Sequence, residues 1–357
     1  LLLLLAVLIG AAYYLNRPAP SAPVIEGAVA GKPVFANLDV NAVAALEFVS
    51  VNTTLQVARA ESGWTIPSLY AYPAQFSRIA GFLRKVADLE VGQVMRHGEA
   101  SLREYGLDPE QAGDPDHVAV TLSGANGAPL ARFTLGALKH RGQSDAMGMG
   151  FPQGRFMRVE NGPVLLIDEL FTDVVMSPVE WLDRELAAIN QEDVVSVSVK
   201  TAENAYTLRR DAEKTFVLDE QTDLAVNADN ARRLLQNLQN IRFDTLVDPA
   251  KPDEEVGLHN ADTVIVRLGT GLEYTFTIGQ GTDGGAQRAL RVSAAAANDN
   301  EERKAEAAAL NAKHGNWRYL LPSFLVAQWT PSRDSLIVSP PAEAAPESEA
   351  SNLDMMP

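Results

Sequence analysis

The chain has 357 residues, roughly twice the usual length of a single domain, so its length favours two domains. Its formal net charge of −16 repels polyanions, and no cluster of lysine and arginine overrides that field, so no nucleic acid partner is expected. The chain contains no cysteine, which excludes disulfides, thiolate metal ligands and cysteine nucleophiles.

The first fifteen residues, LLLLLAVLIGAAYYL, are apolar and carry no charge. A transmembrane helix needs about 20 apolar residues, and the sequence opens without Met, so we expect preceding residues to complete a span. Tyr13, Tyr14 and Arg17 resemble the interfacial end of such a span. We therefore predict that residues 1–15 are an N-terminally incomplete anchor in a bacterial inner membrane, with the remainder on the periplasmic side. A cleaved signal peptide is the alternative.

Two segments have compositions that cannot form a core. Residues 16–33 contain four prolines and predict a semi-rigid spacer between the membrane and the folded part. Residues 339–357 contain acidic but no basic side chains and predict a disordered tail.

Between these segments, one set of landmarks occurs twice in the same order. Trp64 and Phe216 lie 152 positions apart, and Gly106 and Gly257 lie 151 apart. The other matched landmarks are Leu83, Val86 and Leu89 with Leu235, Leu238 and Ile241; Val118, Val120 and Leu122 with Val264, Val266 and Leu268; and RFTLG (132–136) with TFTIG (275–279). We therefore predict two copies of one domain, residues 34–188 and 189–338.

Each copy reads as strands, then one helix, then more strands. Alternating apolar residues and a hairpin come first, followed by apolar residues at helical spacing, such as Phe76, Ile79, Leu83 and Val86. This pattern predicts an α+β fold: two tandem, mainly antiparallel sheets, each with one principal packed helix. The predicted core residues are Trp64, Leu83, Val86, Phe216, Leu235 and Leu238.

Two further segments have specific predictions. Residues 298–315, NDNEERKAEAAALNAKHG, have no counterpart in the first copy and predict an inserted, exposed, charged helix. The segment around Trp181 and Leu182 joins the two copies, and we expect these two side chains to pack at an interdomain contact.

The repeated Gly-Leu pair, in SLREYGL and in EEVGL, suggests a structural cap. Gly106 and Gly257 are predicted to take the left-handed conformation after a short helix, which costs other residues about 1 kcal/mol or more. Leu107 would then contact Leu102 across the helix end. In the second copy Asp253 replaces that leucine, so the apolar contact is lost.

No pattern for chemistry stands out. The five histidines lack the spacing of metal ligands, and the glycine-rich stretches lack the phosphate-binding fingerprint. No hydrolase or metalloprotease motif is present. We therefore predict no catalytic residue, no cofactor and no metal site, and expect the protein not to be an enzyme.

The tandem pattern resembles the DUF4340 family, a domain of unknown function. The resemblance rests on Trp64 after a hairpin, the helix around Leu83, the YGL at 105–107 followed by Pro109, and FTLG at 133–136. The second copy departs from it, with Phe216 in place of tryptophan. The family implies bacterial membrane-anchored proteins that accompany a gliding-motility-type ABC transporter as auxiliary components, and no catalytic residues can be carried over.

The expected function is therefore that of a non-enzymatic, membrane-anchored envelope protein that binds integral subunits of an ABC-transporter-type complex. The alternative is an envelope hydrolase or carbohydrate-binding module with its site between the two copies.

Overall fold

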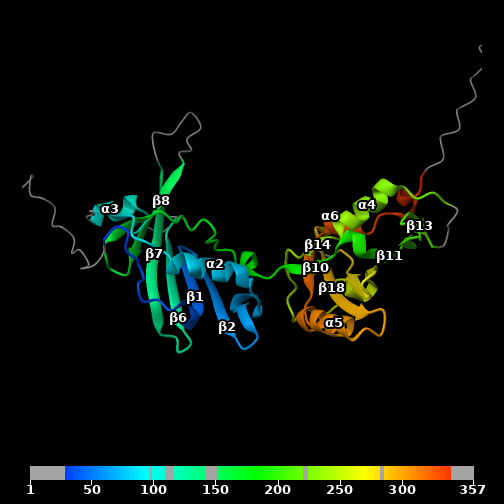
Figure 1. Ribbon diagram of the computed structural model, residues 1–357, viewed down its shortest axis with the longest axis horizontal. Coiled ribbons are helices and arrows are strands. Elements are labelled where there is room, and N and C mark those ends of the chain that lie inside the picture. Colours follow the sequence, from blue (N-terminus) through cyan, green and yellow to red (C-terminus); the bar gives the residue numbers. More distant parts are fainter. Residues whose placement is uncertain are drawn as a thin grey trace, which may run out of the picture. The chain divides into compact units, whose positions relative to one another are not determined.

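A computed structural model describes residues 29–95, 99–108, 116–140, 151–219, 224–281 and 285–338. The chain divides between Asp183 and Arg184 into two compact units, here called unit 1 and unit 2. Both are built from antiparallel sheets with few helices, so the fold is mainly β within the predicted α+β class (Figure 1).

Unit 1 is a nine-stranded antiparallel sheet with one long helix, and its strand order is β4-β3-β2-β1-β6-β7-β8-β9-β5. Its strands are β1 (Val43–Ser50), β2 (Thr53–Ala60), β3 (Gly63–Ile66), β4 (Tyr72–Pro73), β5 (Gln93–Met95), β6 (Val118–Gly124), β7 (Pro129–His140), β8 (Pro152–Val159) and β9 (Val164–Ile167). Its helices are α2 (Phe76–Ala87), α3 (Glu99–Glu104) and the 3-10 turns η1 (Val40–Ala42), η2 (Pro67–Leu69) and η3 (Pro178–Trp181).

Helix α2 covers one face of this sheet (Figure 1). Its buried residues are Ile79, Phe82, Leu83 and Val86, which recur at helical spacing as predicted. Phe82 meets the ring of Phe48 on β1 at 5.1 Å between centroids. The helix begins after Gln75, and Pro73 just before it pairs with Thr65 in the sheet.

Unit 2 is an eight-stranded antiparallel sheet of order β13-β12-β11-β16-β17-β18-β19-β15, beside a short β10-β14 pair. Its strands are β10 (Glu185–Ala188), β11 (Val194–Lys200), β12 (Ala205–Arg210), β13 (Phe216–Leu218), β14 (Asn240–Arg242), β15 (Thr245–Leu246), β16 (Asp262–Leu268), β17 (Leu272–Ile278), β18 (Gln287–Ala296) and β19 (Tyr319–Pro322). Its helices are α4 (Ala228–Asn237), α5 (Glu301–His314), α6 (Ser323–Trp329) and the 3-10 turns η4 (Gln191–Asp193), η5 (Leu258–Asn260) and η7 (Arg333–Leu336).

Apart from β4, the strand order of unit 1 recurs in unit 2 element for element. Helix α4 follows the third strand of its sheet as α2 does, and Asn227 caps it by accepting bonds from the amides of Asp229 and Asn230. The first strand of each sheet carries a bulge at the same place, between Val43 and Ala45 and between Val194 and Ser196. The bulges fix an offset of 151 residues between the two first strands.

The pairing of the strands corrects one predicted offset. Leu46 pairs with Leu122 in unit 1, and Val197, 151 positions after Leu46, pairs with Val266 in unit 2. Leu122 therefore corresponds to Val266, whereas the sequence comparison matched it with Leu268. A slip of two residues keeps each side chain on its own face of the sheet, so alternation alone could not reveal this error.

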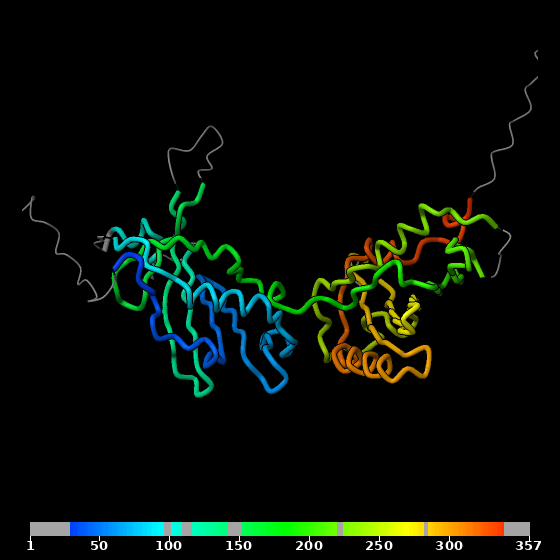
Figure 2. Tube along the Cα trace, in the orientation of Figure 1, coloured from blue at the N-terminus to red at the C-terminus, as the bar shows by residue number. Residues whose placement is uncertain are grey.

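Both predicted domain starts lie a few residues too late. The Gly31 amide donates to the Val91 carbonyl at 2.7 Å and the Val91 amide to the Lys32 carbonyl at 2.9 Å, so the end of the predicted spacer pairs with the segment after α2 (Figure 2). Strand β10, predicted to belong to the first copy, pairs in the same way with β14 of unit 2. These short pairings are non-local, so no periodicity marks them.

The insertion at 298–315 forms helix α5 as predicted, but it is not free of the sheet. The Asn311 side chain donates to the Ala294 carbonyl and accepts from the Ala294 amide, both at 2.8 Å. Ala307 and His314 are buried. The helix therefore packs on β18 through one face, and the prediction of an exposed helix holds only for its other side.

No helix within the described ranges is long and apolar enough to cross a bilayer. The predicted anchor at 1–15, most of the spacer and the predicted tail at 339–357 lie outside the described residues.

Candidate binding groove

The predicted core residues fall into two groups. Leu83, Val86, Leu235 and Leu238 are buried. Trp64 and Phe216, the aromatic landmarks of the two copies, are only half-buried. Both lie at the start of the third strand, at the margin of the sheet, so the helix beside them covers them only in part.

In unit 1 this margin is hollowed into a groove of about 450 Å³. Its lining comes from η1, β1, β2, β3 and α2, and consists of Val40, Asn41, Val43, Arg59, Trp64, Phe76, Ala80, Leu83, Arg84, Ala87 and Asp88. This volume is within the range of sites that hold small molecules or the anchoring side chains of a peptide. We call it the α2 groove.

Helix α2 shapes the floor of the α2 groove. Phe76, Ala80, Leu83 and Ala87 follow one another at intervals of three or four residues, so they lie along one side of the helix. Phe76, predicted to be part of the buried stripe, has 65% of its surface exposed. The small alanines lower the floor between the larger side chains. A large exposed aromatic ring beside a concave apolar floor is typical of a binding surface.

A second, polar hollow of about 510 Å³ adjoins the α2 groove and shares Arg84 and Asp88 with it. Lys85 contributes to its lining and pairs with Asp173 at 2.9 Å and Glu169 at 3.2 Å. The hydrogen bond to Asp173 raises the pKa of Lys85 above its ordinary value, and Glu169 adds to this shift against the effect of burial. These charges are therefore paired with one another.

The two predicted caps have the expected geometry. Gly106 and Gly257 adopt φ values of +63° and +73°. The Leu107 amide donates to the Leu102 carbonyl at 2.8 Å, and the Gly106 amide donates to the Arg103 carbonyl at 3.1 Å, which is the Schellman pattern. Leu107 is buried in a cluster that includes Leu102. The repeated Gly-Leu is thus a turn of the fold.

The same pair of hydrogen bonds surrounds Gly257, where Asp253 replaces Leu102. Its carboxylate accepts from Arg291 at 3.0 Å and from Arg318 at 3.0 Å. Burial favours the neutral form of Asp253, but the two arginines outweigh it and hold the pKa of Asp253 below its ordinary value. The apolar contact is lost as predicted, and two ion pairs stand in its place.

The glycines that end FTLG and FTIG lie against these turns. A Cβ on Gly136 would lie 2.2 Å from the Tyr105 carbonyl oxygen, and one on Gly279 would lie 2.5 Å from that of Val256. Backbone approaches this close admit only glycine. In each copy, the Gly-Leu turn and the glycine that ends FTLG or FTIG therefore pack against each other.

In each unit, an arginine on the strand that follows this glycine stabilises the contact by donating to the glycine carbonyl. Arg155 Nε donates to the Gly136 carbonyl at 2.8 Å, and Arg288 Nε donates to that of Gly279 at 2.6 Å. Arg155 is buried and also donates to three other carbonyls. Burial lowers the pKa of its guanidinium, while the charge of Asp116 opposes the shift.

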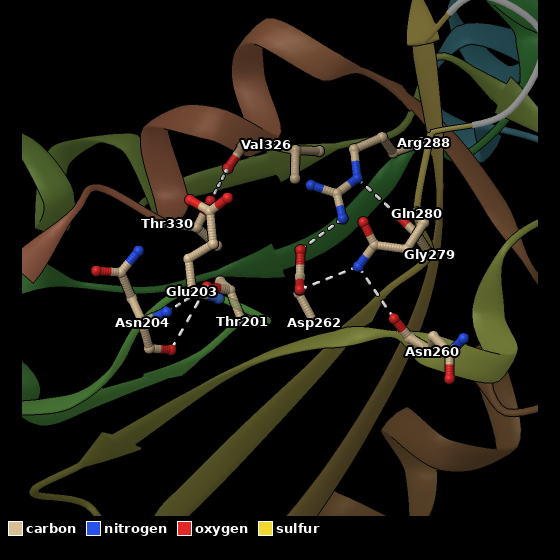
Figure 3. A network of polar contacts seen from close by, with 10 residues as sticks. All are labelled: Thr201, Glu203, Asn204, Asn260, Asp262, Gly279, Gln280, Arg288, Val326 and Thr330. Carbon is tan, nitrogen blue, oxygen red and sulfur yellow. Dashed lines mark hydrogen bonds and ion pairs between the residues drawn. The ribbon is translucent and has the colours of Figure 1, made fainter.

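Arg288 differs in donating directly to a carboxylate. It donates to Asp262 Oδ2 at 2.6 Å, while the Gln280 amide donates to Asp262 Oδ1 at 3.1 Å and to the Asn260 carbonyl at 3.0 Å. Figure 3 shows these side chains converging on the Asp262 carboxylate. Both carboxylate oxygens are occupied, so Asp262 serves to hold the turn beside β16.

A family model described as "Domain of unknown function (DUF4340)" matches residues 64–261, more than half of the chain. The chain belongs to the DUF4340 family. The match begins at Trp64 in the α2 groove of unit 1 and ends just before β16 of unit 2. Neither the curated proteins nor the solved structures give a match.

In this DUF4340 chain, Trp181 and Leu182 belong to the core of unit 1. Both side chains are 1% exposed, and the Trp181 ring lies 5.1 Å from that of Phe48 and 6.4 Å from that of Phe82. Leu182 bridges to Ala74 beside α2. Both side chains therefore pack inside unit 1 against β1 and α2, and their predicted role in an interdomain contact stays a prediction.

Within the described parts of the DUF4340 chain, no three histidine, aspartate or glutamate side chains are grouped as a metal site requires. Among the five histidines, His314 is buried and contacts the Tyr319 hydroxyl at 2.8 Å. The glycine-rich segment at 141–150 lies outside the described residues.

Sequence reasoning missed the polar residues of the α2 groove. Arg59 was not singled out, although it pairs across the hairpin with Trp64 just as Arg210 pairs with Phe216. Arg155 and Arg288 were also missed. Comparing the two copies position by position could have found them, because each arginine recurs at an equivalent place.

Proposed function

We propose that this DUF4340 protein is a non-enzymatic, membrane-anchored component of the bacterial envelope that binds integral subunits of an ABC-transporter-type complex. The α2 groove is the contact with the partner. The observation that carries this proposal is the exposed ring of Phe76 next to the half-buried ring of Trp64, over a floor of small and apolar side chains.

The anchor and the duplication are further parts of the proposal. An uncharged N-terminal segment, followed by prolines, would hold unit 1 near a bilayer on the periplasmic side. The shared strand order supports descent of both units from one domain by tandem duplication. Duplication leaves one copy free to keep the fold while the other specialises in binding.

Site-specific crosslinking tests the proposed contact. A photoreactive amino acid replaces Phe76 in the full-length protein in its own membrane, and the control replaces Phe324, an aromatic residue of unit 2 with nearly the same exposure, 66% against 65%. We expect crosslinks to integral transporter subunits from position 76 and none from 324. Crosslinks to soluble proteins only, or equal products at both positions, would contradict the proposal.

The anchor requires a separate test. The full-length protein should remain in the membrane fraction after a high-salt wash, and deletion of residues 1–15 should release it. Release of the intact protein by salt would show a peripheral attachment instead.

A further inference from the structure

Two cations stand on different walls of the α2 groove. Arg59 comes from β2 and Arg84 from α2, and both side chains are exposed. Across the described residues, neither guanidinium takes part in an ion pair or hydrogen bond. Their presence is notable in a chain whose net charge is −16, where carboxylates outnumber cations and most arginines of unit 2 are paired.

The equivalent place in unit 2 shows such an arginine with an acidic partner. Arg210 lies over the Phe216 ring at 5.2 Å, donates to the Gln191 carbonyl at 3.1 Å and pairs with the Glu192 carboxylate at 3.7 Å. Counted along the aligned first strands, Glu192 corresponds to Asn41 of unit 1. Asn41 is neutral, so the acid that holds Arg210 in unit 2 is missing from the α2 groove.

Helix α4 also differs from α2 at two positions that line the α2 groove. At the positions of Phe76 and Ala80, helix α4 has Ala228 and Arg232, and Arg232 extends to Asp229 at 2.8 Å. The aromatic edge is absent there and a long side chain replaces the small one. Unit 2 therefore has a paired arginine where unit 1 has the small Ala80, and Ala228 where unit 1 has the exposed ring of Phe76.

The size of the α2 groove limits its ligand. Phe76 to Ala87 spans about 16 Å of helix, which equals about five residues of extended peptide. The lining combines apolar side chains with the two cations Arg59 and Arg84, and Asp88 is its carboxylate. The complementary ligand therefore has an apolar side chain in the middle and negative charge beside it.

We propose that the α2 groove binds a short, extended peptide segment of the partner protein in which an apolar side chain is flanked by carboxylates. Trp64, Phe76 and Leu83 receive the apolar side chain, and Arg59 and Arg84 receive the carboxylates. This inference rests on the proposed function, because it specifies the partner's segment at the same groove.

The test uses fluorescent synthetic five-residue peptides and the full chain. The probe peptide has a central leucine flanked by aspartate and glutamate, and its matched control has asparagine and glutamine at those places. Fluorescence polarisation should show the acidic peptide binding about tenfold or more tightly than its amide counterpart. Equal affinity for the two peptides, or binding of neither, would overturn the inference.

Variants then assign the preference to named residues. The double variant Arg59→Gln/Arg84→Gln should abolish the preference for the acidic peptide, and Asn41→Glu should reduce it by giving Arg59 the partner that Arg210 has in unit 2. Glu192→Asn is the matched control and should leave peptide binding unchanged. An unchanged preference in the double variant would refute the assignment.

The crosslinking result separates this inference from the proposed function. If transporter subunits are captured at position 76 but the acidic peptide is not preferred, the inference of an acidic peptide ligand is refuted and the proposed partner stands. If the acidic peptide binds but crosslinking at position 76 captures no transporter subunit, the proposed partner is refuted and the preference of the α2 groove for acidic peptides stands.

Discussion

The two units differ in how an arginine and an aromatic side chain beside the principal helix are paired. In both, an arginine on the second strand lies opposite an aromatic residue on the third. In unit 2 that arginine is held by Glu192 and covers the ring. In unit 1 the ring and the arginine remain available within the α2 groove. The same strand order thus carries an ion-paired arginine in one unit and an exposed arginine in the other, through a change of a few side chains.

A second difference concerns the arginine that fastens the turn, and we expect it to give the largest effect. Arg288→Met leaves the nearly buried Asp262 carboxylate without its cation and should destabilise unit 2 by about 3 kcal/mol or more. Arg155→Met in unit 1 chiefly leaves backbone carbonyl oxygens without their donor and should cost less.

Urea unfolding followed by hydrogen exchange reads the two units of the full chain separately. Adding Asp262→Asn to Arg288→Met should recover part of the lost stability, because the unpaired charge is removed. An equal loss in Arg155→Met and Arg288→Met would contradict this account of the difference.

The capping glycines should give the next largest effect. Gly106→Ala forces a left-handed alanine and should cost about 1 kcal/mol. Gly257→Ala carries the same strain and also places a Cβ 2.4 Å from the Gln280 carbonyl oxygen, so it should cost at least about 2 kcal/mol. Calorimetry of the full chain measures both, and a smaller loss at Gly257 would show that the turn in unit 2 relaxes.

The residue four positions before each capping glycine should make the turn of unit 2 more sensitive to acid than that of unit 1. The folded-state pKa of Asp253 is lowered by Arg291 and Arg318, so its ion pairs stabilise fully above the unfolded pKa of about 4 and lose that contribution as the pH falls through the lower folded value. Leu102 has no such group. Protection of the Leu258 amide should therefore fall below about pH 4 while that of Leu107 persists.

Asp253→Asn checks the cause of this acid sensitivity. The variant should remove the pH dependence of protection at Leu258 and leave Leu107 as before. A fall in protection at Leu258 that persists in the variant would assign the effect to another carboxylate.

The smallest effect is expected at the ion pair that distinguishes Arg210 of unit 2 from Arg59 of unit 1. Glu192 is exposed and its pair with Arg210 is long, so Glu192→Asn should change the stability of unit 2 by no more than about 0.5 kcal/mol. A melting temperature that falls by several degrees would show that the pair of Glu192 and Arg210 also supports the fold.

Local patterns allowed much of this architecture to be predicted. The strand and helix order follows from the period of apolar residues, and the caps at Gly106 and Gly257 follow from the cost of a left-handed backbone. The exact match of Leu122 with Val266 did not follow, since a slip of two residues preserves the faces of a strand. The pairing of Gly31 with Val91 joins distant segments and has no local signal.

The sequence by itself therefore determined the order of elements, the family and the positions where only glycine fits, because these depend on neighbours along the chain. Tertiary structure decided that Trp64 lines a groove, that Trp181 fills a core, and that Asp253 binds two arginines. The reason is physical. Whether an aromatic or charged side chain is covered, paired or free depends on residues that the fold brings beside it from other elements. The local sequence around that side chain does not identify those residues.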